Sequence, residues 1–457
     1  MTLRLVHRRE LGARVLALSL CLAALLGSHA DVAGAAAHAD VAGAAAASPR
    51  TASPYPAGAT RPALVARPSE LAHSAARRAA HAAAHAAAHE PQKERKKKHS
   101  KPLLHGNPAR ALLAFQAMQQ HYYLQGSGLY EGEPFSFLWP FSQAFAATVS
   151  MANVNIPGMS ASFQRELRAR LVGLNDYLDV TNSDASEGAF TSTLPAFDGT
   201  VAPPVGPGGA KYYDDNDWVG IELARLYKID HSPAVLGSAE AIMAFEMAGW
   251  QTDPQLACPG GIPFSNGIES HERNAVTNAP AAELGVQLYK LTGEAQYLQF
   301  AEMAYQWVRS CLLQPNGMYA DHISPKGVIE PMLWSYNQGS MVGAGTLLYQ
   351  ATGNSEYLFQ ARQTARAALA YFTLERLATE NPFFPSVYFR NLLYLDSVTR
   401  DPPGPTIAQA YVNYAWQHLR LSDDVFVSGS PASAQLLVQA AIVQIYALLS
   451  SPASTYF

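Results

Sequence analysis

Two adjacent aspartates, Asp214 and Asp215, are the residues of this chain whose type and spacing best suit acid–base catalysis. They stand in the sequence Tyr-Tyr-Asp-Asp-Asn-Asp-Trp at 212–218, directly before an apolar run at 219–224. Two neighbouring carboxyl groups can divide acid–base work, because one can hold a proton while the other stays charged. The aromatic rings around them offer flat faces on which a sugar can lie. The pattern therefore predicts carbohydrate chemistry.

The same two residues also have a purely structural interpretation. Aspartate is favoured at the N-cap of a helix, where its side chain accepts hydrogen bonds from free backbone N–H groups. The apolar run at 219–224 is typical of a helix that begins near the aspartates. The short motif alone does not decide between a cap and a catalytic pair, so the surrounding elements have to be considered.

Composition divides the 457 residues into an unusual N-terminal segment and a globular remainder. Four early arginines, an apolar stretch at 15–26 and Ser-His-Ala at 28–30 predict a secretory signal peptide over 1–30. Residues 31–106 are rich in Ala, His and Pro, and we expect a disordered linker there. The sequence therefore predicts a secreted or cell-envelope protein whose folded domain covers 107–457.

Two features of the linker could bind something. His81, His85 and His89 would share one helix face, but they lack the Cys or carboxylate partners typical of a metal site, so we expect no metal there. The basic run at 93–101 could hold the protein loosely at an anionic envelope surface, or it could simply be a solvated linker.

The charge of the folded part limits its partners. Residues 107–457 carry 17 basic and 30 acidic residues, a net charge of −13. Such an acidic domain argues against nucleic acid as the ligand and is compatible with a neutral polysaccharide. We expect a monomer. Export would permit Cys258 and Cys311 to form a disulfide, but the sequence leaves their pairing open.

A helical repeat runs through the domain. Leu-Tyr pairs at 226–227, 288–289 and 348–349 end three apolar helical segments, with spacings of 62 and 60 residues between the tyrosines. Turns containing Gly293 and Gly353 follow two of them, as expected for helix C-termini. An alanine stands twelve residues after each tyrosine, at Ala239, Ala301 and Ala361. The repeat predicts helical hairpins of about 60 residues.

The length of the domain then limits its architecture. The 351 residues of 107–457 leave room for about six such hairpins. Twelve helices are predicted to start near Pro108, Phe135, Ala161, Asp214, Pro233, Asn278, Ala295, Asn337, Glu356, Pro385, Thr406 and Ala432. Six hairpins could form an open solenoid, but the last segment, 434–449, is apolar and cannot serve as a polar end cap. We therefore predict a closed (α/α)6 barrel of six helical hairpins.

Closure would place the first helix of each hairpin inside and gather polar residues at one rim. Trp139, Trp218 and Trp334 lie near the starts of inner helices, whereas Trp250, Trp307 and Trp416 lie near the ends of outer helices and read as packing anchors. The rim would also contain Arg273, Asn274, Asn278, Asp321, His322 and residues 335–339. Amides and carboxylates beside aromatic rings are typical of a carbohydrate cleft.

The sequence at 212–218 resembles the Asp-Asp motif of glycoside hydrolase family 76, the endo-α-1,6-mannanases and related fungal wall enzymes. The segments 260–264, 273–278, 333–339 and 389–393 also resemble this family, and the similarity covers nearly all of 107–457. The resemblance implies an (α/α)6 barrel that hydrolyses α-1,6-mannosidic bonds in α-mannan with retention of configuration, without a metal or cofactor. It further implies that Asp214 is the nucleophile and Asp215 the general acid/base. Asp217 lies outside the motif and could tune a pKa or cap the helix.

Sugar-binding candidates follow from the same motifs and rim loops. Amides and charged groups could bond sugar hydroxyls, and the rings could stack on sugar faces. The candidates are Trp139, Tyr213, Trp218, Asn274, Asn278, Asp321, Trp334, Tyr336, Asn337, Gln338 and Arg390. Each of them could instead serve only as loop or cap structure.

Three other functions remain open on the sequence. The same site could transfer sugar to sugar, as in a cell-wall transglycosylase, because a covalent glycosyl intermediate can be captured by either acceptor. A non-catalytic glycan-binding envelope protein is another possibility. Other (α/α)6 enzymes, such as sugar epimerases and unsaturated glucuronyl hydrolases, are the third possibility. Epimerases of this fold usually depend on paired histidines, and the rim loops hold only His271 and His322, without a clear partner pattern.

Overall fold

The structure is a computed structural model that describes residues 104–180, 194–267, 271–400, 404–430 and 435–457. The expected signal peptide, the basic run at 93–101 and nearly all of the expected linker lie outside the described residues. Within these five described ranges, no helix is long and apolar enough to cross a membrane.

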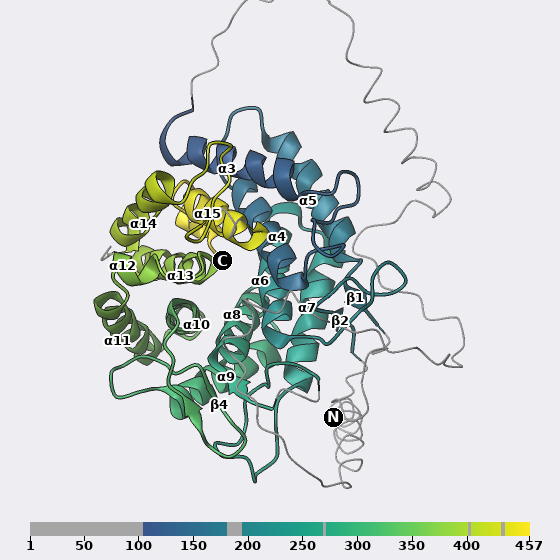
Figure 1. The fold of residues 1–457 in the computed structure, drawn as a ribbon. Coiled ribbons are helices and arrows are strands. Elements are labelled where there is room, and N and C mark those ends of the chain that lie inside the picture. The colour runs from purple at the N-terminus through teal and green to yellow at the C-terminus, as the bar shows by residue number, and fades with distance from the viewer. Residues whose placement is uncertain (1–103, 181–193, 268–270, 401–403, 431–434) are drawn as a thin grey trace, which may run out of the picture. The chain divides into compact units, whose positions relative to one another are not determined.

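Helices dominate the described residues and alternate along the chain between an outer and an inner layer (Figure 1). The inner helices are α4 (Leu138–Ala152), α6 (Tyr213–Asp230), α8 (Ala275–Thr292), α10 (Ser335–Thr352), α13 (Phe383–Thr399) and α15 (Leu436–Leu448). The outer helices are α3 (Gly106–Tyr122), α5 (Ser160–Leu174), α7 (Pro233–Ala248), α9 (Ala295–Leu312), α11 (Ser355–Tyr371) and α14 (Gly404–His418). The short helices α12 (Leu374–Leu377) and η3 (Ala453–Thr455) lie in connections.

The inner helices form a closed ring. Each packs against the next in chain order, and α15 packs back on α4. Each outer helix packs on the inner helix before it, except that α3 packs chiefly on α15 and thereby joins the first helix of the domain to the last. Figure 1 shows the inner helices around the centre and the outer ones outside them. The predicted (α/α)6 barrel is confirmed, and an open solenoid is excluded.

The sequence repeat has a packing explanation. Gly285 lies against Ala301 and Gly345 against Ala361, so close that an added Cβ would stand 3.1 and 3.2 Å from the alanine Cβ. Small residues on both helices of a hairpin let the backbones approach closely. In each Leu-Tyr pair, the tyrosine carbonyl accepts a hydrogen bond from the backbone N–H of the helix C-cap residue. All three C-cap residues have a left-handed backbone conformation. Gly293 is such a residue, with a φ of 78°.

Short strands and a disulfide order the loops at the starts of the inner helices. Strands β1 (Leu178–Asp179) and β2 (Ala196–Phe197) pair antiparallel before α6. Strands β3 (Arg273–Asn274), β4 (His322–Ile323) and β5 (Ile329–Glu330) form a second antiparallel sheet beside α8 and α10. Cys258 and Cys311 form a disulfide, with Cα atoms 6.1 Å apart, so the pairing that the sequence left open does occur.

Four inner helices carry an amide side chain at their fourth residue that binds backbone of the preceding loop. These amide bridges are Asn216 to Phe197, Asn278 to Ile262, Gln338 to Tyr319, and Gln439 to Phe426. In the first three, the amide oxygen accepts the N–H and the amide nitrogen donates to the C=O of the same residue, at 2.7–3.1 Å. Each bridge therefore fixes a loop at a set distance from the first turn of its helix.

We expect Asn278→Ala to destabilise the domain strongly. The change leaves the buried N–H of Ile262 without a partner, whereas its C=O still accepts from the hydroxyl of Thr277 at 3.0 Å. One unsatisfied buried group costs about 1–3 kcal/mol, so urea unfolding should show a loss of that size. The matched control is Asn413→Ala on the exposed face of α14, for which we expect less than about 0.5 kcal/mol. Equal losses in both variants would contradict a structural role for the amide bridges.

Candidate active site

Asp214 and Asp215 lie in the first turn of α6, at the mouth of the barrel. The N-cap residue is Tyr212, whose backbone is extended and pairs with Ser265, so neither aspartate occupies the N-cap position. The backbone N–H groups of Asp214 and Asp215 nevertheless favour the charged form of the Asp214 carboxyl and lower its pKa, although its Oδ1 has no hydrogen-bond partner among the described residues. Negative charge is stabilised at a helix N-terminus. Asp214 is therefore not the helix cap but a buried carboxyl at the mouth, whose charge the helix end helps to stabilise.

Burial makes both carboxyls hard to ionise. Only 8% of Asp214 and 6% of Asp215 is exposed. Burial raises the pKa of Asp214 to about 7, the charge of Asp321 adds to this, and the two backbone N–H groups oppose it. Burial also raises the pKa of Asp215 well above its usual range, and the neighbouring charge of Asp214 raises it further. Such a pair ionises in two separate steps.

The two aspartates face different neighbours. Asp214 interacts electrostatically with Asp321 and Tyr336, which belong to the α10 side of the mouth. Asp215 interacts with Tyr177, whose hydroxyl donates to the carbonyl of Ser136 at 2.6 Å on the α4 side. Adjacent side chains on a helix point about 100° apart. The carboxyls therefore approach the mouth from two directions.

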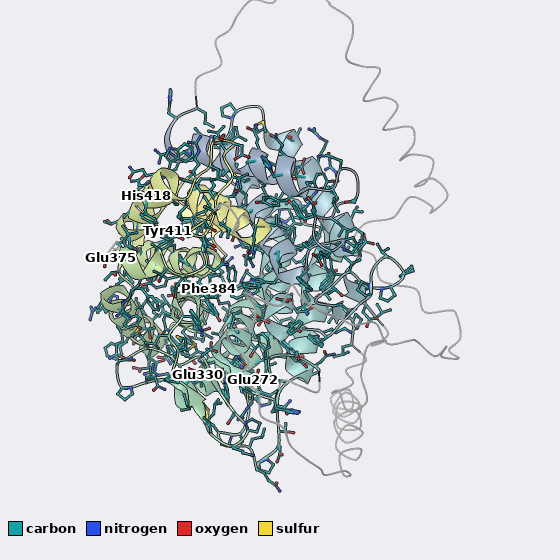
Figure 2. All side chains as sticks on the ribbon, in the orientation of Figure 1. Glu272, Glu330, Glu375, Phe384, Tyr411 and His418 are labelled. Atoms are coloured by element: carbon teal, nitrogen blue, oxygen red, sulfur yellow. A yellow bond between two sulfur atoms is a disulfide. The ribbon has the colours of Figure 1, made fainter. Side chains whose placement is uncertain are left out.

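A polar cluster around Asp321 is built by the three-stranded sheet. Asp321 is 1% exposed; its Oδ1 accepts from the Asn337 side chain at 3.1 Å, and its Oδ2 lies 3.0 Å from Nδ1 of His322. Burial lowers the pKa of His322, but the hydrogen bond and charge of Asp321, with Glu272 and Glu330, produce a net rise. Figure 2 shows the two glutamates at this end of the domain. Asp321 is thus held in place by both neighbours.

Asn274 belongs to the same cluster. It pairs with His322 across β3 and β4, and the next residue, Ala275, donates its N–H to the carbonyl of Asp321. The buried Oδ1 atoms of Asn274 and Asn337 have no hydrogen-bond partner among the described residues. These two amides therefore keep unused hydrogen-bonding capacity next to Asp321.

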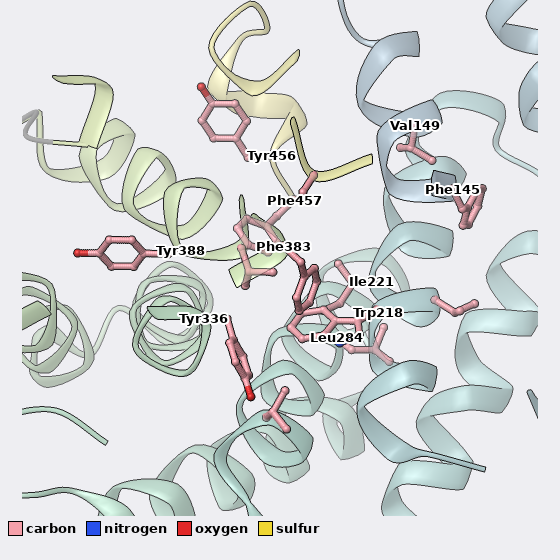
Figure 3. Close-up of a cluster of buried hydrophobic side chains, with 14 of the residues drawn as sticks. Phe145, Val149, Trp218, Ile221, Leu284, Tyr336, Phe383, Tyr388, Tyr456 and Phe457 are labelled. Atoms are coloured by element: carbon pink, nitrogen blue, oxygen red, sulfur yellow. The ribbon is translucent and has the colours of Figure 1, made fainter. Parts of the chain in front are cut away.

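Aromatic rings gather around Phe383, at the start of α13. The ring centroids of Trp139, Trp218 and Tyr336 lie 5.2, 5.6 and 6.1 Å from that of Phe383. Figure 3 shows Trp218, Tyr336 and Phe383 together in the middle of the barrel. Trp334 and Tyr336 also pack on Phe384, with centroids 5.2 and 4.4 Å away. Trp139, Trp334 and Phe384 are partly exposed, so this cluster offers ring surface to a ligand.

Phe383 and Phe384 were missed at the sequence level. Their helix was predicted to start near Pro385, two residues too late, because Pro382 and Pro385 both read as helix-start signals. Three other inner helices, α4, α6 and α10, carry a ring of this cluster in their first two turns: Trp139, Trp218 and Tyr336. The same expectation applied to the Pro-Phe-Phe-Pro segment would have found both rings.

Four predicted sugar-binding residues are positioned for other tasks. Tyr213 stacks on Phe245 of α7, with centroids 4.5 Å apart, and is 2% exposed. Asn278 and Gln338 are fully buried, and both ends of each amide bind backbone in the amide bridges. We therefore assign these three to loop and helix packing instead of sugar contact.

Arg390 is the fourth. It lies two turns inside α13 and donates to Glu222 at 2.7 Å, with Glu283 3.9 Å away. Glu222 also pairs with Arg225, at 2.6 Å. Arg390 is 4% exposed, so it belongs to a buried ion network within the barrel and not to the rim that carries Asp214.

Comparisons with known proteins agree with this geometry. The family model "Glycosyl hydrolase family 76" matches residues 110–391. A mannan endo-1,6-alpha-mannosidase of Saccharomyces cerevisiae, DCW1, is 25% identical over 154 residues, which cover 31% of this chain and 33% of the yeast protein. The chain thus matches about a third of the length of that curated relative.

Solved structures share the fold. A family 76 mannosidase from Bacteroides thetaiotaomicron superimposes with a TM-score of 0.66 at 19% identity, covering 75% of this chain and 98% of that one. The α-1,6-mannanase GH76A of Salegentibacter, in an inactive variant with two consecutive aspartates changed to asparagine and bound to α-1,6-mannotriose, gives a TM-score of 0.61 at 20% identity, covering 76% and 99%. With a family model matched over well more than half of its residues, the chain belongs to glycosyl hydrolase family 76.

Proposed function

We propose that this protein is an exported retaining glycoside hydrolase that cleaves α-1,6-mannosidic bonds within mannan. The observation that carries the proposal is the pair of consecutive buried carboxyls, Asp214 and Asp215, in the first turn of an inner helix. Two findings on relatives support the substrate. The yeast relative is named a mannan endo-1,6-alpha-mannosidase, and the Salegentibacter enzyme is inactive without two consecutive aspartates and binds α-1,6-mannotriose.

In this mechanism Asp214 is the nucleophile. Backbone N–H groups favour the ionised form of its carboxyl, so it loses its proton before Asp215 does. The ionised Asp214 attacks the anomeric carbon and forms a covalent glycosyl–enzyme bond. The mannosyl leaving group departs at the same time.

Asp215 acts as general acid and then as general base. The charge on Asp214 helps Asp215 to keep its proton, which passes to the departing glycosidic oxygen. Asp215 then takes a proton from a water molecule that attacks the glycosyl–enzyme bond. The two displacements together retain the configuration of the anomeric carbon.

The sugar would lie against the partly exposed rings of Trp139, Trp334 and Phe384, with Trp218 and Tyr336 beneath them. The amides of Asn274 and Asn337 and the carboxylate of Asp321 would bond its hydroxyls. A neutral sugar suits this site, because the amides near Asp214 can bond its hydroxyls. The carboxyl groups there would repel an anionic sugar.

Export is the second part of the proposal. It rests on the arginine-rich and apolar pattern of residues 1–30, and the basic run at 93–101 would hold the enzyme loosely at the cell envelope. We also propose that the enzyme acts as a monomer, because one chain carries both aspartates and the ring of inner helices.

Asp214→Asn and Asp215→Asn should each lower turnover of linear α-1,6-mannan by at least about a thousandfold, because each removes a group used in both steps. An activated mannosyl fluoride needs no proton for its departure. Asp215→Asn should therefore still release fluoride from it, and Asp214→Asn should not. The exposed control Asp230→Asn, on the same helix, should behave like the unchanged enzyme. Near-normal turnover of mannan by either catalytic variant would rule out this assignment.

The pH dependence of kcat/KM should place the acidic limb near pH 7, since Asp214 must be ionised and its pKa is raised to about 7. Activity should fall below that pH and persist above it while Asp215 keeps its proton. Asp321→Asn removes a charge that raises the pKa of Asp214, so it should move the acidic limb to lower pH. An acidic limb near about pH 4, the usual value for an exposed aspartate, would contradict the proposed nucleophile.

Time-resolved proton NMR of the products should show the α-anomer first, as retention requires. Short internal fragments from linear α-1,6-mannan would indicate endo cleavage. Chains longer than the starting oligosaccharide would instead show transfer to sugar and favour the transglycosylase. The β-anomer appearing first would contradict a covalent intermediate on Asp214.

A further inference from the structure

Asp217 and Glu246 are two buried carboxylic acids that the proposed reaction does not use. Both are fully buried, and none of their four oxygens makes a hydrogen bond of normal geometry among the described residues. The backbone N–H of Ala281 lies near Asp217 and opposes the rise of its pKa. Burying an ionised carboxylate without a cation is so costly that such a group takes up a proton instead. An apolar side chain of similar size would be cheaper to bury. These acids therefore call for an explanation.

The packing of α6 on α7 fixes where Asp217 lies. At the start of α6, the ring of Tyr213 stacks on that of Phe245 with an interplanar angle of 13°. Further along α6, Gly220 faces Ile242, and an added Cβ would stand 3.2 Å from its side chain. Asp217 lies between these two contacts, and the helices run in opposite directions. Asp217 therefore faces the stretch of α7 between Ile242 and Phe245.

Glu246 directly follows this stretch and interacts electrostatically with both Asp217 and Asp214, so the three carboxyls form one group of acids behind the proposed nucleophile. Asp217 follows Asp214 by three residues and so shares its face of α6. Burial raises the pKa of Glu246, and the charges of Asp217 and Asp214 raise it further. Burial likewise raises the pKa of Asp217, as do the charges of Asp214 and Glu283. The titratable and charged groups around the two acids are Asp214 and Tyr213 on α6, Glu283 on α8, and Arg390 on α13, which faces Glu283.

We propose that Asp217 and Glu246 remain protonated in the working enzyme and position Asp214 from behind as neutral acids. The proposal rests on the proposed role of Asp214 as nucleophile. A protonated carboxyl donates a hydrogen bond, which a carboxylate cannot do. Two neutral acids support the helix face under Asp214 without adding charge next to it. The negative charge of these three carboxyls then stays on the one that attacks the sugar.

The first test is the pH dependence of stability. An acid whose pKa is raised by folding holds a proton in the folded state that the unfolded chain has lost, so stability falls as pH rises between the two pKa values. Each such proton increases the unfolding equilibrium constant tenfold per pH unit. Unfolded carboxyls titrate near about pH 4. Above that pH the two acids together should increase the unfolding equilibrium constant by up to about a hundredfold per pH unit.

The double variant Asp217→Asn/Glu246→Gln keeps the shapes but cannot lose these protons. Urea unfolding should be measured over about two pH units centred near neutrality. The unfolding equilibrium constant of the double variant should rise clearly less with pH than that of the unchanged enzyme. The control is Asp230→Asn/Glu240→Gln, which neutralises more exposed carboxyls on the same two helices and should leave the slope unchanged. Equal slopes in all three proteins would overturn the proposal.

Infrared spectra supply a readout that a merely structural role would not change. At neutral pH the folded enzyme should show carbonyl bands of protonated carboxyls, and these should weaken in the double variant but not in its control. Unchanged bands would overturn the proposal. Neither the unfolding nor the infrared result depends on the substrate, so failure of the mannan assignment would be distinguishable.

Kinetics test the positioning role. Asp217→Ala should lower kcat on mannan by about tenfold or more with KM nearly unchanged, because the support under Asp214 is lost. Asp217→Asn should recover most of that loss, since an amide is neutral and can still donate. A fall in Asp217→Asn as large as that in Asp214→Asn would mean that the charge of Asp217 is required, and would overturn the proposal.

Discussion

The mouth of the barrel depends on the amide bridges, which hold its loops against the first turns of four inner helices. Asn216 is one of these residues and lies between the catalytic pair and Asp217. Its amide binds both backbone groups of Phe197, so the loop from β2 is fixed to the turn that carries Asp214. Because the loop is held through its backbone, its side chains can vary without moving it. The reactive carboxyls can therefore be concentrated at the start of one inner helix.

Burial and the helix end act on the aspartates in opposite directions. Removal from water raises the pKa of both carboxyls, whereas the free N–H groups of the first turn stabilise charge on Asp214. The balance allows one carboxyl to ionise near neutrality while its neighbour keeps a proton. Deeper in the barrel, carboxylates such as Glu222 are instead paired with arginines. The acids near Asp214 lack such partners, which is the physical difference between the site and the core.

The sequence was sufficient to predict the barrel, since helical periodicity and the 60-residue repeat reflect close packing within each hairpin. It also placed Asp214 and Asp215 correctly at the start of an inner helix, because a family motif and the helical pattern agreed; their catalytic role stays a prediction. It could not separate amides that keep an unpaired oxygen from amides that bind backbone: Asn337 and Asn278 look alike in polar rim segments. Asn278 is the fourth residue of its helix and Asn337 the third, and only the amide at the fourth position binds the backbone of the preceding loop. The difference therefore depends on the exact residue at which each helix starts.

The most direct test of the account is to identify the residue that carries the covalent intermediate. A fluorinated α-mannosyl fluoride forms the glycosyl–enzyme bond and slows its hydrolysis, and peptide mass spectrometry then locates the attached sugar. The account predicts one attached sugar, on Asp214. Attachment to Asp215, or turnover of the reagent without any labelled peptide, would contradict it.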